Sequence, residues 1–172
     1  MSLPNQDPSS AAGALYALLP RGLSSSTWEE YGLDLPAGHG VDLSAAILIL
    51  TLYWIRQALT TWVAKPVGTE VLIQLAQQIE AGWISELGLG DREPDEVFDC
   101  AEEHWARYET ISLAGGDAMT VANEAVAVLE FDGVLAPGTR GKALALLMDI
   151  VPVESVAELV ESFPLPRASY GG

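Results

Sequence analysis

The sequence predicts an all-α fold, a single compact domain of five or six helices, and two observations support it. Apolar residues recur three and four positions apart in several consecutive segments, which is the spacing of one face of an α-helix. Glycine, proline and helix-capping residues separate these segments, and no stretch of useful length shows the alternation of a half-buried strand. The chain has 172 residues, 49% of them hydrophobic, and is therefore long enough to bury a core.

The most apolar segment, residues 43–55, predicts the helix around which the others pack. We expect this helix to span residues 43–64, to be mostly buried and to be capped by Asp42 or Ser44. The apolar run is shorter than the ~20 residues that a membrane-spanning helix needs. A span that includes Arg56 is the alternative, but it would place a costly charge in lipid. We therefore expect no membrane partner.

Helices are also expected on both sides of this segment. Residues 13–19 favour a short helix, and residues 27–31 favour a single turn. Pro66 is expected to end the buried helix. The later helices are expected to be opened by a proline or by a residue that can cap them, and these residues are Thr69, Pro94, Asp117, Thr139 and Pro152.

The two ends of the chain are expected to lie outside the domain. Residues 1–12 are mostly polar or small and contain two prolines, so we interpret them as a disordered N-terminal segment. Residues 164–172 have the composition of a flexible C-terminal tail. The helical domain is thus predicted to span residues 13–163.

The charge of the chain restricts its partners. Its net charge is -16, from 24 acidic and 8 basic residues. We expect no binding to nucleic acid, because the phosphate backbone would repel such a chain. A basic protein partner fits this charge, and a high-salt environment would also account for it. The single cysteine excludes an intramolecular disulfide and favours a reducing, cytoplasmic location.

Residues 90–109 contain the densest group of acids, with eight carboxylates against two arginines. Three of these acids, at positions 95, 99 and 102, line up along one side of a helix, opposite an apolar stripe. This arrangement is typical of a solvated helix face and also of a surface that meets a basic partner. The candidate partner-binding residues are the first seven acids of this stretch and one tryptophan that an interface can use as an anchor: Asp91, Glu93, Asp95, Glu96, Asp99, Glu102, Glu103 and Trp28.

A calcium loop is an alternative interpretation of the same stretch. Counted from its first acid, the carboxylates at positions 1, 3, 5, 9 and 12 are Asp91, Glu93, Asp95, Asp99 and Glu102. Glu96 stands where such a loop needs a glycine for its sharp turn, and Pro94 is better suited to the start of a helix. The spacing alone therefore does not predict calcium binding.

His104 is the centre of two further alternatives. A carboxylate metal site in a helical bundle requires a glutamate three residues before a histidine, but Ala101 occupies that position. Cys100 and His104 are four residues apart and hence neighbours on a helix, as in a thiol–imidazole pair. The surrounding acids should raise the pKa of the thiol and hinder its activation. We therefore expect no cofactor and no catalytic residue here.

From these observations we expect a non-enzymatic, acidic interaction protein with an inhibitor, immunity-type or chaperone-like role. One alternative is a viral or bacterial structural protein that self-associates into a homo-oligomer through its apolar helices. Another is a helical-bundle enzyme that binds a metal through carboxylates.

Overall fold

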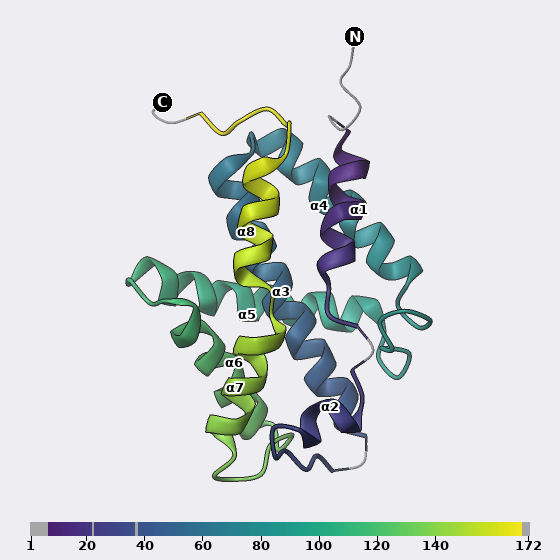
Figure 1. The fold of residues 1–172 in the computed structure, drawn as a ribbon, viewed down its shortest axis with the longest axis vertical. Helices are drawn as coiled ribbons and strands as arrows, with labels where there is room; N and C mark the ends of the chain where they lie inside the picture. The colour runs from purple at the N-terminus through teal and green to yellow at the C-terminus, as the bar shows by residue number, and fades with distance from the viewer. Residues whose placement is uncertain (1–6, 22, 37, 170–172) are drawn as a thin grey trace. The chain divides into compact units, whose positions relative to one another are not determined.

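A computed structural model describes residues 7–21, 23–36 and 38–169, and every regular element in these ranges is a helix. The eight helices are α1 (Pro8–Leu18), α2 (Ser25–Glu29), α3 (Gly40–Trp62), α4 (Lys65–Ala81), α5 (Pro94–Leu113), α6 (Ala118–Phe131), α7 (Arg140–Ile150) and α8 (Val153–Ser162) (Figure 1). The expected all-α fold with a mostly buried apolar helix is confirmed. Six of these helices match the expected ones, and the short helices α1 and α2 lie where a short helix and a turn were expected.

The helices form two compact units, and α3 contributes to both. The first unit contains α1, the part of α3 from Thr51 onward, α4 and α8. The second unit contains α2, the part of α3 up to Leu50, α5, α6 and α7. All candidate partner-binding residues lie in the second unit.

In the first unit, α1 packs along α4 and also contacts α8 (Figure 1). This helix starts at Pro8, before the predicted start of the domain, because the Asp7 side chain accepts a hydrogen bond from the Ser9 amide at 3.1 Å. Ala12 and Leu15 are fully buried and hold the helix in place. The expectation of disorder therefore does not hold from Pro8 onward, and residues 1–6 lie outside the described part of the chain.

Part of the expected C-terminal tail is also held in the first unit. The Ala64 amide donates to the Pro166 carbonyl at 2.8 Å, and the Ala168 amide donates to the Trp62 carbonyl at 3.2 Å. The side chain of Leu165 is buried. These contacts tie residues 165–168 to the end of α3, whereas residues 170–172 are among those that the structure does not describe.

The boundaries of two helices, α3 and α4, also differ from the predicted ones. The helix α3 starts at Gly40, so Asp42 lies inside the first turn, and its carboxylate contacts other side chains instead of capping the helix. The helix α4 starts at Lys65 because Pro66 fits a first turn, where its missing N–H is not needed. It thus begins before Thr69, the expected first residue, and it ends at Ala81.

In the second unit, α6 packs against both α5 and α7. The helix α5 buries the predicted stripe, which comprises Val97, Ala101, Trp105 and Tyr108. The Trp105 indole N–H donates to the Ile49 carbonyl of α3 at 2.9 Å. This burial fixes the rotation of α5 and leaves its acidic side toward solvent.

Within the described residues, α3 alone is long and apolar enough to cross a membrane by length and composition. Of its most apolar 18-residue window, 61% is buried inside the protein.

Candidate functional site

The candidate site is an acidic face on α5 and the loop before it. We define the acidic face as the seven carboxylates Asp91, Glu93, Asp95, Glu96, Asp99, Glu102 and Glu103, all of which are exposed. Pro94 starts α5, so Asp95 and Glu96 lie in its first turn, where carboxylates interact favourably with the helix dipole. The predicted exposure of these residues follows from the burial of the opposite stripe.

No carboxylate of the acidic face forms an ion pair with any residue that the structure describes. The two arginines of the same stretch instead contact acids on other helices. Arg92 pairs with Asp42 on α3, and Arg107 lies 3.9 Å from a carboxylate oxygen of Glu124 on α6. The acidic face therefore lacks local charge compensation.

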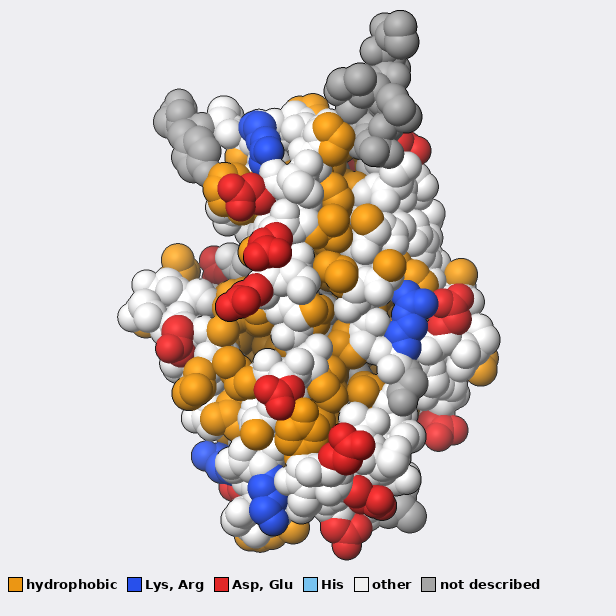
Figure 2. Space-filling model, in the orientation of Figure 1, with side chains coloured by type: hydrophobic (Ala, Val, Ile, Leu, Met, Phe, Trp, Pro, Cys, Tyr) orange, Lys and Arg blue, Asp and Glu red, His pale blue; other side chains and the backbone are white. Residues whose placement is uncertain are grey.

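The second unit carries most of the negative charge of the chain. It contains 18 acidic and five basic residues, whereas the first unit contains six acidic and three basic residues. On the side of the molecule that Figure 2 shows, Asp and Glu side chains are also more numerous than Lys and Arg side chains. The acidic face is thus the densest part of a generally acidic unit.

Trp28, the expected interface anchor, lies on α2 and is half-buried. Its ring packs against Gly40, where an added Cβ would lie 2.8 Å from the ring atom Cη2. Trp28 and Asp91 both line a shallow cavity of about 350 Å³, which no other member of the acidic face lines. The structure therefore brings Trp28 to one edge of the acidic face and uses much of its ring for packing.

The calcium interpretation is incompatible with the backbone of this segment. Positions 4 to 12 of the hypothetical loop form the first turns of α5 instead of a loop around an ion. No group of three His, Cys, Asp or Glu side chains is placed to hold a metal ion within the described ranges.

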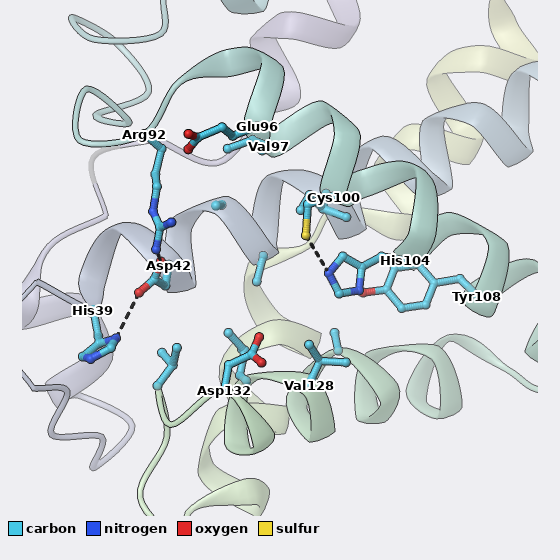
Figure 3. A pocket seen from close by; sticks show the side chains of 16 residues that line it. His39, Asp42, Arg92, Glu96, Val97, Cys100, His104, Tyr108, Val128 and Asp132 are labelled. Carbon is cyan, nitrogen blue, oxygen red and sulfur yellow. Dashed lines mark hydrogen bonds and ion pairs between the residues drawn. The ribbon is translucent and has the colours of Figure 1, made fainter.

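A cavity of about 480 Å³, which the spacing of residues in the sequence does not predict, lies between α3, α5 and α6 (Figure 3). Short side chains leave this space open, since Ala45 and Ala46 of α3 and Ala125 of α6 all line it. The only sign of this cavity in the sequence is the presence of alanines on the apolar faces of these helices. Glu96, Cys100 and several other polar residues also line it.

One end of the cavity carries a three-residue polar cluster (Figure 3). Arg92 reaches from the segment before α5 and forms an ion pair with Asp42. The Nδ1 atom of His39 lies 3.0 Å from the other carboxylate oxygen of Asp42. The charges of Arg92 and Asp42 therefore neutralise each other.

Farther along α5, Cys100 and His104 face the same cavity, and the Sγ atom lies 3.3 Å from Nε2 of the imidazole. Desolvation, followed by the charges of Glu103 and Asp132, raises the pKa of the Cys100 thiol. Desolvation, followed by the charge of Arg107, lowers the pKa of His104. Both groups are consequently neutral near pH 7, and the pair does not supply the thiolate that nucleophilic catalysis needs.

Comparison of the chain with protein-family models, with curated proteins and with solved structures finds no match to any of them.

Proposed function

We propose that this protein is a non-enzymatic interaction protein that binds a basic protein surface through its acidic face. The observation that carries the proposal is the set of seven exposed carboxylates without an ion-pair partner among the described residues. An inhibitor, an immunity-type protein or a chaperone-like protein of the cytoplasm would use such a surface.

Electrostatics explains how the acidic face would act. Carboxylates this close together repel one another, which lowers the stability of the free protein. A basic partner relieves the repulsion, accelerates association and selects against acidic competitors. Trp28, beside Asp91, adds an aromatic contact at the edge of the surface.

Two charge-reversal variants, one on the acidic face and a matched control elsewhere, test the proposal. The first variant combines Asp95→Lys, Asp99→Lys and Glu102→Lys on α5. The control combines Glu154→Lys, Glu158→Lys and Glu161→Lys, which are exposed residues of α8 with the same spacing and the same change of charge. Partners are captured from source-cell lysate at low salt, eluted at high salt and identified by mass spectrometry, and their affinities are then measured with purified proteins.

We expect the α5 variant to bind the partner at least roughly tenfold more weakly, while the control stays within a few-fold of the wild type. Circular dichroism of each variant confirms that its helices are retained. Equal losses in both variants would indicate attraction to overall charge alone, and unchanged affinity of the α5 variant would refute the proposal.

Self-association is a second candidate function because several large apolar side chains of the second unit are exposed, and Leu113 and Phe131 are the most exposed of those described. Leu113 at the end of α5 is 80% exposed, and Phe131 at the end of α6 is 90% exposed. Such side chains can take part in contacts between copies of the chain. Sedimentation of the wild type and of a Leu113→Ser/Phe131→Ser variant tests self-association. An oligomeric wild type together with a monomeric variant would support self-association through these side chains. A monomeric wild type would exclude it.

A further inference from the structure

We propose that the cavity between α3, α5 and α6 binds a small organic cation, a protonated amine on a compact apolar body. This site is separate from the protein-binding function proposed above, because only Glu96 belongs both to the acidic face and to the cavity lining.

The size and the lining of the cavity suit a small molecule. Its volume of about 480 Å³ lies in the range of roughly 300–1,000 Å³ typical of ligand sites. Half of the lining residues are aliphatic and provide an apolar surface for the body of a ligand: Ala45, Ala46, Ile49, Val97, Ala125, Val128, Leu129 and Val134.

The charges that line the cavity select a cation. Among the described residues that line the cavity, Arg92 is the only Lys or Arg, and Asp42 already neutralises it. Glu96 and Asp132 remain, and neither forms an ion pair with a residue in the described ranges. Two carboxylates are thus available to an ammonium group, which forms stronger hydrogen bonds with ionised acceptors than with neutral ones.

The end of α6 adds to this preference. Asp132 is the C-cap residue of α6, so its carboxylate lies at the helix terminus that carries a partial negative charge. Cys100 and His104, which face the cavity from α5, are neutral near pH 7 and add no opposing positive charge. A cation is therefore attracted by the side chains and by the helix dipole together.

Calorimetric titration of the full chain at pH 7 and low salt tests the proposal, with 2-phenylethylamine as the probe and 2-phenylethanol as its neutral analogue. We expect the amine to bind roughly tenfold more tightly than the alcohol. A Glu96→Gln/Asp132→Asn variant should lose this preference. The matched control is Asp95→Asn/Glu102→Gln. It also converts one Asp to Asn and one Glu to Gln, but at residues of α5 that do not line the cavity. This control should still bind the amine more tightly than the alcohol.

Cys100 provides a second readout at the site itself. Its thiol is exposed and lines the cavity, and it is the only cysteine of the chain. As the amine concentration is raised, the rate of Cys100 alkylation by iodoacetamide should fall and then level off once the cavity is saturated. The alcohol should have the same effect only at higher concentration.

Several results would overturn the proposal: no binding of the amine at millimolar concentration, equal affinities for amine and alcohol, equal losses in both double variants, or binding without protection of Cys100. The acidic-face proposal is tested separately, because the Asp95→Asn/Glu102→Gln control alters that face and leaves the cavity lining intact.

Discussion

The Sγ atom of Cys100 lies 3.3 Å from Nε2 of His104, one turn further along α5, and the contact joins two neutral groups. The pKa of the thiol is raised and that of the imidazole is lowered, in each case chiefly by desolvation. The contact is therefore a weak hydrogen bond and not a thiolate–imidazolium ion pair.

We predict that Cys100 reacts slowly with iodoacetamide near pH 7, because little of the thiol is ionised there. The alkylation rate should rise with pH and reach its plateau only above the ordinary pKa of a thiol. Replacing Glu103 by Gln removes a charge that raises the pKa, so the pH profile should move to lower pH. Glu102→Gln is the control and should leave the profile unchanged. A profile that reaches its plateau near neutral pH would contradict this picture.

We predict that protonation of His104 destabilises the fold. Because the pKa of His104 is lower in the folded chain than in the unfolded chain, its contribution to stability is present above the unfolded-state pKa of about 6.5. This contribution is lost as the pH falls through the folded-state pKa. The unfolding free energy from urea titration should therefore decrease from pH 7.5 to pH 5.5.

Replacing His104 by Leu should remove this component of the pH dependence. The substitution also removes Nδ1, which is buried without a hydrogen-bond partner among the described residues. At pH 7.5 it should be neutral or stabilising by about 1 kcal/mol. If the unfolding free energy of this variant decreased between pH 7.5 and pH 5.5 as steeply as that of the wild type, groups other than His104 would be responsible for the pH dependence.

We predict opposite effects for alanine at two glycines of the second unit. At Gly116, an added Cβ would lie 2.5 Å from Cγ2 of Ile111 and 2.9 Å from its carbonyl oxygen, so Gly116→Ala should destabilise the chain by about 1–3 kcal/mol. At Gly141, the second residue of α7, no described atom beyond the adjacent residues and the backbone of its own helix lies within 4 Å of the added Cβ, and the substitution should stabilise the helix by roughly 0.5–1 kcal/mol. Urea denaturation measures both, and effects of equal sign would show that the packing around Gly116 differs from that described.

We predict that Trp105→Phe lowers the unfolding free energy by about 1–3 kcal/mol. The substitution keeps an aromatic ring but removes the buried N–H that donates to Ile49 at 2.9 Å. Trp54 of α3 is the control, because its indole donates no hydrogen bond to the described residues, and Trp54→Phe should cost less. If both variants lost the same stability, ring volume and not the hydrogen bond would be responsible.

The sequence by itself determined the all-α fold and the side of α5 that faces solvent. Pro94 marks the start of α5, and the spacing of Val97, Ala101 and Trp105 identifies its buried stripe. These features depend on helix geometry within one segment, so residue spacing is enough to predict them. The exposure of the acidic face follows from the same spacing.

Only the tertiary structure decided which residues of different segments meet. Arg92 pairs with Asp42, 50 residues away, and not with the acids beside it in sequence. Trp28 packs on Gly40, and alanines of α3 and α6 leave a cavity that also exposes Glu96, Cys100 and Asp132. Residue spacing determines which side chains share a helix face. The distance between two helices depends instead on how all the side chains between them pack, and this packing is a property of the folded chain alone.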